Sequence, residues 1–281
     1  MRMSLLILSS LFVGCTGPAD KADKTDSDGD GLTDKQEAKL GSDPNSADSD
    51  ADGLDDKTEN DLGTDLLNAD TDGDGYTDLQ ESQAATDPVD ANSVIYKGGW
   101  PYNSDKDAMP EGDPKERRIT VGKSEVPHFM LKDQFGDVVD VYDFAHQGKP
   151  MILDLSGAWC YWCNEAAKLV GGDHSSALWG YGFDDMHDRV AEGHFYWLTV
   201  LDAAGSSYND PPTDRTISSW YKSYPEPEIP ILADVDWEVR GWINPSGWPT
   251  MMYVDENMIV QAYDDQDYTV AFQAAIDGDT Q

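Results

Sequence analysis

Basic residues are scarce in this chain. It has 19 lysines and arginines against 55 aspartates and glutamates, which gives a formal net charge of -36. Binding to nucleic acid requires clusters of lysine and arginine that neutralise phosphates, and the sequence contains none. The same shortage argues against docking on an anionic lipid surface. Because metal cations are the natural counterions of such a chain, we expect cation binding and no nucleic-acid partner.

The sequence also lacks an apolar run near its start that could span a bilayer, which takes about 20 residues. The run Leu5–Val13 is much shorter and follows a basic start, so residues 1–14 are predicted to be a secretory signal. The ending "FVGC" resembles the lipobox of bacterial lipoproteins, in which the cysteine is lipidated, although Phe12 replaces the usual leucine. We therefore expect an exported protein of the bacterial cell envelope, lipidated at Cys15 and anchored to a membrane. Ordinary cleavage that leaves a free Cys15 thiol is the alternative.

Cysteine is rare too, with three residues in 281. Cys160 and Cys163 form the only Cys-x-x-Cys pair, so a zinc site would lack two of its four ligands. His174, His187 and His194 do not show ligand spacing either. A structural disulfide is possible because exported cysteines oxidise, but closing so short a loop stabilises weakly. A redox pair and a structural disulfide remain to be distinguished.

The chain has two compositionally different parts. Residues 20–92 contain 23 acidic residues, 5 lysines, and no arginine, tryptophan or histidine. All nine tryptophans and all five histidines follow. We predict a tether over residues 15–25, an acidic repeat segment over 26–92, a linker or extended arm over 93–118, and a globular domain over 119–281. Within the linker, Trp100 and Tyr102 are candidates to pack on the following domain.

The acidic part contains three copies of one loop. They are "DSDGDGLTDKQE" from Asp26, "DSDADGLDDKTE" from Asp48 and "DTDGDGYTDLQE" from Asp70, spaced 22 residues apart. Carboxylates at positions 1, 3 and 5, a glycine at 6 and a glutamate at 12 are the spacing of a calcium loop, with a carbonyl ligand at position 7. Carboxylates rather than cysteine or histidine indicate a hard ion. The predicted metal ligands are Asp26, Asp28, Asp30, Leu32, Asp34, Glu37, Asp48, Asp50, Asp52, Leu54, Asp56, Glu59, Asp70, Asp72, Asp74, Tyr76, Asp78 and Glu81.

The pattern "DxDxDGLxDxxE" with "GTDP"-like links resembles the thrombospondin type 3 repeats of bacterial surface proteins. That resemblance implies loops stacked around calcium ions, with binding and folding as one event. A disordered acidic spacer is an alternative, since composition alone would predict disorder. A dockerin pair is disfavoured because the links look too polar and short to supply a helix after each loop.

The second part shows an alternating pattern of strands and helices. We predict buried strands at 151–155 and 195–201, helices at 164–170 and 216–224, a hairpin at 250–263 and a final helix at 268–276. This order indicates an α/β fold, with a central sheet flanked by helices on both faces. A Cys-x-x-Cys at a strand–helix junction in such a setting is typical of thioredoxin-like redox proteins.

The stretch "VPHFMLKDQFGDVVDVYDFAHQGKPMILDLSGAWCYWC" resembles the opening of TlpA-type thioredoxin-like reductases, and "GWPTMMYVDENMIV" resembles their later cis-proline motif. The resemblance covers about residues 120–279. It implies a thiol–disulfide oxidoreductase that needs no cofactor beyond its own disulfide and acts with client proteins and a redox partner protein. Tyr161-Trp162 depart from the usual dipeptide between the cysteines, which leaves the reduction potential open.

The resemblance also implies roles for five residues. Cys160, at a helix N-terminus, is the expected nucleophile, and Cys163 the resolving thiol. Asp154 occupies the position of the family's buried carboxylate, which helps move the proton of the resolving cysteine. Pro249, if its preceding bond is cis, would hold backbone where a substrate can pair. Trp159 would shield the site, although a core role is equally compatible. The competing hypothesis is a calcium-binding or adhesion protein whose thioredoxin-like domain is a non-catalytic scaffold.

Overall fold

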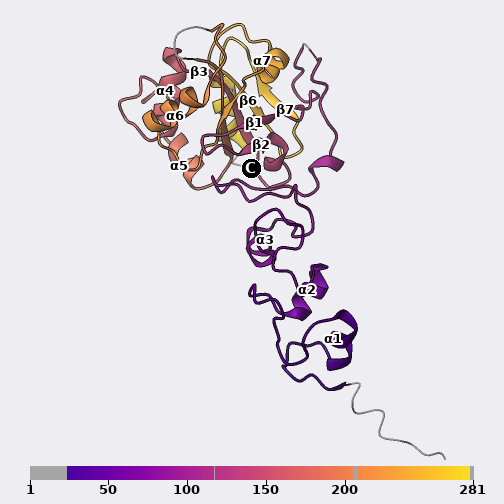
Figure 1. Ribbon diagram of the computed structural model, residues 1–281. Helices are drawn as coiled ribbons and strands as arrows, with labels where there is room; N and C mark the ends of the chain where they lie inside the picture. Colours follow the sequence, from indigo (N-terminus) through magenta and orange to yellow (C-terminus); the bar gives the residue numbers. More distant parts are fainter. Residues whose placement is uncertain (1–23, 117, 205–207, 279–281) are drawn as a thin grey trace, which may run out of the picture. The chain divides into compact units, whose positions relative to one another are not determined.

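The computed structural model describes residues 24–116, 118–204 and 208–278 (Figure 1). The chain divides between Ser93 and Val94 into two compact units. The predicted signal peptide and the lipidation at Cys15 lie outside the described residues. Among the described helices, none combines the length and the apolar composition needed to cross a bilayer.

The first unit has three short helices, each of which begins at position 9 of an acidic loop. These are α1 (Asp34–Leu40), α2 (Asp56–Leu62) and α3 (Asp78–Ala84). Each begins at a side-chain N-cap, which is Thr33, Asp55 or Thr77, and reverses into a left-handed residue at its end. We expected no helix here, and this was wrong, because local capping fixes two turns of helix without the paired apolar faces that longer helices need. The argument against a dockerin pair therefore loses its basis.

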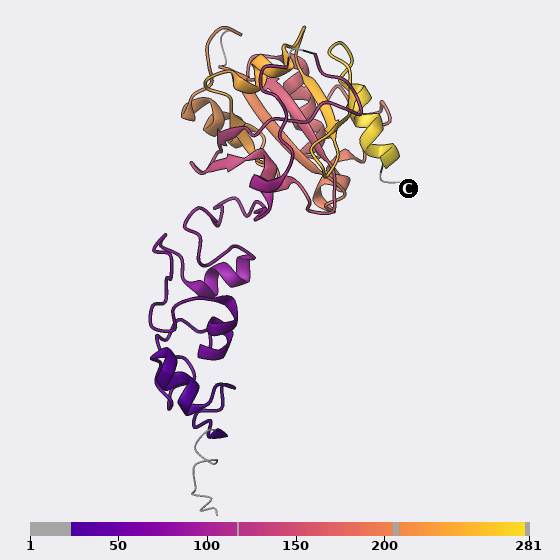
Figure 2. The same ribbon diagram turned by 90° about the vertical axis from the view of Figure 1, so that its right-hand side faces the viewer.

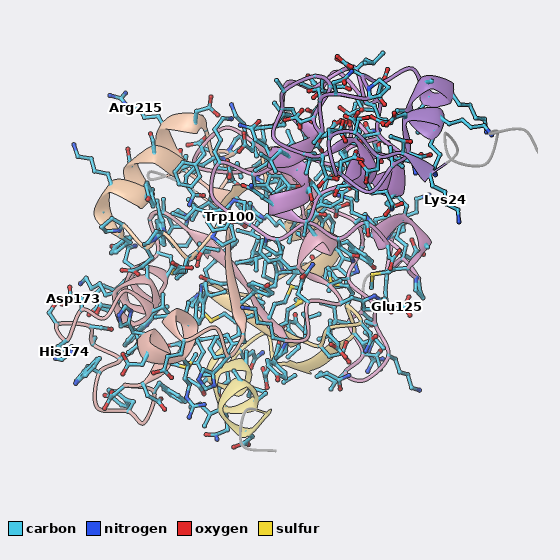
Figure 3. The ribbon with its side chains drawn as sticks, turned by 90° about the horizontal axis from the view of Figure 1, so that it is seen from below. Lys24, Trp100, Glu125, Asp173, His174 and Arg215 are labelled. Carbon is cyan, nitrogen blue, oxygen red and sulfur yellow. A yellow bond between two sulfur atoms is a disulfide. The ribbon has the colours of Figure 1, made fainter. Side chains whose placement is uncertain are left out.

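Carboxylates occupy much of the interior of this unit. The side chains of Leu32, Leu54 and Leu66 are buried, but so are those of several acids. In Figure 3 the oxygen-tipped side chains gather along the purple loops of this unit. The acidic residues with no exposed surface are Glu37, Asp56, Glu59, Asp78 and Glu81. An interior of this kind is costly unless the charges are compensated.

The second unit contains a seven-stranded mixed sheet. Its order is β2-β1-β5-β4-β3-β6-β7, with β3, β4 and β5 parallel and the outer strands antiparallel. The strands are β1 (Met130–Lys132), β2 (Val138–Asp140), β3 (Met151–Gly157), β4 (Tyr196–Ala203), β5 (Ile231–Ala233), β6 (Thr250–Val254) and β7 (Val260–Tyr263). The predicted strands correspond to β3, β4, β6 and β7. The short parallel strand β5 was not predicted.

Helices cover both faces of this sheet, which confirms the predicted fold class (Figures 1 and 2). They are α4 (Tyr161–Val170), α5 (Met186–Ala191), α6 (Asp214–Ser223), α7 (Glu238–Ile243) and α8 (Thr269–Gly278). Side chains of α4, α5 and α8 pack with Ile152 of β3, whereas those of α7 pack with Leu153 and Leu155. Successive residues of β3 thus point into different cores, and all seven are buried.

The predicted linker contacts the domain as an extended arm, in which the structure describes one short 3-10 turn, η2 (Lys106–Ala108). Tyr96 and Trp100 are buried in the core on the α7 side of the sheet. The indole N–H of Trp100 donates to Asp133 Oδ2 at 2.8 Å, and the Tyr96 hydroxyl donates to Asp143 Oδ2 at 2.5 Å. Aromatic burial and these hydrogen bonds hold the arm in place.

Candidate active site and calcium loops

The two cysteines lie where β3 ends and α4 begins. Cys160 is the N-cap of α4 with extended backbone, and its sulfur accepts a hydrogen bond from the Cys163 N–H at 3.2 Å. Cys160 and Cys163 are joined by a disulfide. The geometry follows from sequence, because the apolar run of β3 leads through Gly157 into a helix that starts at Tyr161. The pair thus sits at the positive end of a ten-residue helix.

The two cysteine residues are much less exposed than the aromatic residues next to them. Cys160 retains 4% of its surface and Cys163 none. The aromatic residues around them are much more exposed, with Trp159 at 40%, Tyr161 at 60% and Trp162 at 45%. Of the two cysteines, only Cys160 keeps any accessible surface, and its neighbours in sequence carry exposed rings. Exposed aromatic clusters of this kind commonly mark interaction sites.

The loop before β6 packs against the cysteines. The Trp248–Pro249 peptide bond is cis. Trp248 packs against the cluster that contains Cys160 and Cys163, and its ring centroid lies 5.5 Å from that of Trp159. Pairing of Thr250 with Leu155 places the start of β6 beside the end of β3. The two sequence motifs, about ninety residues apart, are thereby brought together.

Asp202, at the end of β4, holds this loop and was not among the predicted site residues. Its Oδ2 accepts the Trp248 indole N–H at 2.9 Å and lies 3.6 Å from Arg240 Nε. The Arg240 guanidinium also lies over the rings of Trp237 and Trp248, at 5.1 and 5.2 Å from their centroids. Burial raises the pKa of Asp202 to about 6. An acid at the carboxyl end of a parallel strand was the available sequence signal.

Asp154 lies in the middle of β3 and is buried. It points to the same face as Ile152, which packs against Ala166 of α4, so it lies on the side of the sheet that carries the cysteines. Its Oδ1 accepts from Ser156 Oγ at 2.7 Å, and its Oδ2 from Thr199 Oγ1 at 3.5 Å. Burial raises the pKa of Asp154 to about 7, more than these hydrogen bonds lower it.

A groove of about 330 Å³ runs beside the cysteines, between the start of α4 and α6. The Tyr224 hydroxyl donates to Asn164 Oδ1, and Asn164 Nδ2 donates to the Cys160 carbonyl, both at 2.5 Å. Arg215 extends from the first turn of α6 at its edge (Figure 3). The residues that line the groove are Ala158, Asn164, Thr213, Arg215, Thr216, Ser219, Trp220, Ser223 and Tyr224. The groove thus offers polar side chains next to the disulfide.

The segment 171–188 covers the sheet rather than lining this groove. Leu178 and Met186 are buried in the core that contains α8, and Phe183 meets Phe272 edge to face. Glu165 holds the segment by accepting the Ala177 N–H at 2.5 Å. These contacts make the segment a cap on the α4–α8 face.

The three loops in the first unit each gather carboxylates. The ligand oxygens of the acids at positions 1, 3 and 5 lie within 4.8 Å of one another in every loop. The three groups are Asp26, Asp28 and Asp30; Asp48, Asp50 and Asp52; and Asp70, Asp72 and Asp74. The position-1 carboxylate also accepts the backbone N–H three residues on, at 2.7 Å in each loop. The spacing of the acids in the sequence thus brings their carboxylate oxygens together in each loop.

Several carboxylate oxygens in these loops are buried and have no hydrogen-bond partner, as expected for ligands of a cation. Both oxygens of Glu37, one of Glu59 and one of Glu81 are buried and accept no hydrogen bond. The same holds for Oδ2 of Asp28, Asp30, Asp50 and Asp72. Burial, and then neighbouring carboxylates, raise the pKa of Glu59 to about 8. Hard-oxygen donors that are otherwise unsatisfied fit calcium, which would supply the missing positive charge.

The acids at position 9 behave differently from the other predicted ligands. Both oxygens of Asp56 accept hydrogen bonds from Ser49, and those of Asp78 from Thr71. Asp34 makes the same contacts with Ser27. In each loop the acid at position 9 therefore accepts hydrogen bonds from the residue at position 2, and these bonds close the loop.

Two of the three acidic repeats match a known family model. The model of the bacterial TSP3 repeat matches residues 26–47 and 70–91. No curated protein matches the chain. The structure is similar to MTB dsbF in mixed oxidized and reduced forms, with 18% identity over 53% of this chain and 95% of that one, and a TM-score of 0.37.

Two further similar structures are the pneumococcal exposed lipoprotein thioredoxin Etrx1 from Streptococcus pneumoniae and a thiol:disulfide interchange protein from Bacteroides sp.. The first has 16% identity over 53% of this chain and 98% of that one, with a TM-score of 0.37. The second has 15% identity over 58% and 92%, with a TM-score of 0.40. The chain combines repeats that match the bacterial TSP3 model with a mixed α/β domain whose Cys160–Cys163 disulfide lies at a strand–helix junction.

Proposed function

We propose that the chain is an exported thiol–disulfide oxidoreductase, lipid-anchored at Cys15 in the bacterial cell envelope and carried on calcium-binding repeats. The observation that carries the redox role is the position of Cys160. It caps α4, its sulfur accepts a helix N–H, and it keeps 4% of its surface accessible, whereas its disulfide partner Cys163 keeps none. The helix N-terminus stabilises a thiolate at Cys160 more than it would at a residue inside the helix.

The reduced pair would act in two steps. The Cys160 thiolate attacks a client disulfide, forming a mixed disulfide and releasing one client thiolate. The Cys163 thiolate then attacks the Cys160 sulfur, which releases the second client thiolate and forms the Cys160–Cys163 disulfide. The client gains two electrons and the pair loses two. A redox partner protein with thiols must reduce the pair again, and the same steps in reverse would oxidise a client.

Asp154 is proposed to accept the proton of Cys163 in the second step. It lies on the face of β3 that α4 covers, and its raised pKa of about 7 suits proton exchange near neutral pH. The exposed rings of Trp159, Tyr161 and Trp162 would contact the client around Cys160, and the loop at Pro249 would lie beside it. Trp159 thereby acts as both a packing partner of Trp248 and a contact surface.

The deciding experiment measures insulin reduction with dithiothreitol as the electron source. The Cys160→Ser chain should lose turnover, whereas Cys15→Ser, the same substitution at a cysteine outside the Cys-x-x-Cys pair, should retain it. Turnover unchanged in Cys160→Ser would support the non-catalytic scaffold instead.

A further inference from the structure

A group of three carboxylates joins the first two repeats. The ligand oxygens of Asp30, Glu37 and Asp56 all lie within 4.8 Å of one another. Asp30 and Glu37 are positions 5 and 12 of the first loop, whereas Asp56 is position 9 of the second loop and the first residue of α2. The second repeat therefore places an acid among the predicted ligands of the first.

This group lacks compensation from the protein. Glu37 has no exposed surface, and neither of its carboxylate oxygens accepts a hydrogen bond. Asp30 Oδ2 is also buried without a partner. Three carboxylates at this separation and this burial repel one another strongly when ionised, and a bound cation would neutralise that charge.

Contacts within the second loop fix the direction of Asp56. Its Oδ1 accepts the Ser49 N–H and its Oδ2 the Ser49 hydroxyl, both at 2.8 Å. Each carboxylate oxygen has two acceptor sites, so one remains for a metal. Asp34 makes the same contacts in the first loop but is only partly buried, whereas Asp56 is fully buried.

We propose that Asp56 is a ligand of the calcium ion bound by the first repeat, so that this site is complete only when the second repeat is folded against it. The inference rests on the proposed calcium-binding role of the repeats. It makes the first two repeats one binding and folding unit, because the ion of one repeat takes an oxygen from the next.

The second junction is built differently. There the Leu79 N–H of α3 donates to Asp52 Oδ2 at 3.0 Å, so a backbone amide takes the oxygen that corresponds to Asp30 Oδ2. No group of Asp52, Glu59 and Asp78 meets the same distance among the described residues. The shared carboxylate is therefore assigned to the first junction only.

Hydrogen exchange with mass spectrometry, at increasing calcium concentrations on the full chain, reports each repeat separately. In Asp56→Asn, the calcium midpoint for protecting residues 26–37 should rise roughly tenfold or more, in line with the loss of a metal-site carboxylate. In the matched control Asp78→Asn, position 9 of the third repeat, the midpoint for residues 48–59 should stay within about twofold of the wild type, because Asp78 forms no such group with Asp52 and Glu59 among the described residues.

A third variant separates ligation from packing. Ser49→Ala removes one contact that orients Asp56 but keeps its carboxylate, so it should shift the midpoint of residues 26–37 much less than Asp56→Asn. Equal shifts in these two variants, or an unchanged midpoint in Asp56→Asn, would overturn the proposal while leaving calcium binding intact. Absence of calcium protection in the wild-type chain would overturn the calcium role itself.

Discussion

The indole N–H of Trp248 donates a 2.9 Å hydrogen bond to Oδ2 of Asp202, and this bond ties the loop before Pro249 to the end of β4. The same indole packs against the cluster of Cys160 and Cys163. Asp202 has no exposed side-chain surface, and Arg240 is the cation beside it. The loop next to the disulfide is thus held by a buried carboxylate that no sequence motif identified.

Replacing Trp248 by phenylalanine should destabilise the domain by about 1–3 kcal/mol, because it removes the donor to a buried carboxylate. Urea unfolding of the oxidised chain measures this. In Asp202→Asn the side-chain carbonyl can still accept the indole N–H, so its loss should be smaller. Destabilisation by Asp202→Asn that exceeds that by Trp248→Phe would mean that the charge, more than the hydrogen bond, holds the loop.

Cys163→Ser should trap the client on Cys160. Without the resolving thiol, the mixed disulfide formed in the first step cannot be released within the chain. Incubating the reduced variant with an oxidised peptide and analysing it by non-reducing mass spectrometry should show a one-to-one adduct. Cys160→Ser, treated identically, should show far less adduct, since Cys163 has no exposed surface. Comparable adducts on both would remove the assigned order of attack.

Asp154→Asn should slow turnover by roughly 10²-fold, the lower end for loss of a general acid–base group. The formation of the mixed disulfide should be nearly unaffected, because the role of Asp154 concerns Cys163. Stopped-flow measurement of the two steps distinguishes them. A slower first step with an unchanged second step would place Asp154 outside proton transfer.

The stability of the oxidised domain should fall as pH rises from about 4 to about 7. Burial raises the folded-state pKa of Asp154 to about 7 from 3.8, so the folded state keeps a proton that the unfolded state releases. Below pH 4 both the folded and the unfolded state hold the proton, so the carboxyl of Asp154 no longer lowers the stability of the fold. Asp154→Asn lacks this dependence, so its stability relative to the wild type should increase over that window by a few kcal/mol, on the order of 1.4 per pKa unit. A pH-independent difference between the two chains would contradict this.

Removing calcium should unfold the first unit and leave the second unchanged. Millimolar calcium should increase the helical circular dichroism signal of the chain, and EDTA should reverse it, because carboxylate repulsion opposes folding without the ion. Tryptophan fluorescence is an internal control, since all nine tryptophans follow residue 92. Helical signal that does not respond to calcium would contradict the fit of these loops to the ion.

Local patterns determined much of this protein. The predicted strand at 250–254 coincides with β6, and the predicted strand at 151–155 lies within β3. These segments are recognisable because burial on both faces leaves continuous apolar runs. The three acidic loops were also readable, since their ligands are close in sequence and the loop geometry is local. The helices that begin within those loops were missed, although their capping residues are equally local.

Tertiary structure decided what depends on distant residues. Pairing of β3 with β6 is what brings Trp248 to Cys160, and the end of β4 supplies Asp202. The approach of Asp56 to Glu37 arises only when one repeat stacks on the next. The sequence by itself determines which side chains can bind calcium or exchange electrons. Which of them meet depends on packing between elements. The burial and the charge compensation of each side chain come from neighbours that are distant in sequence.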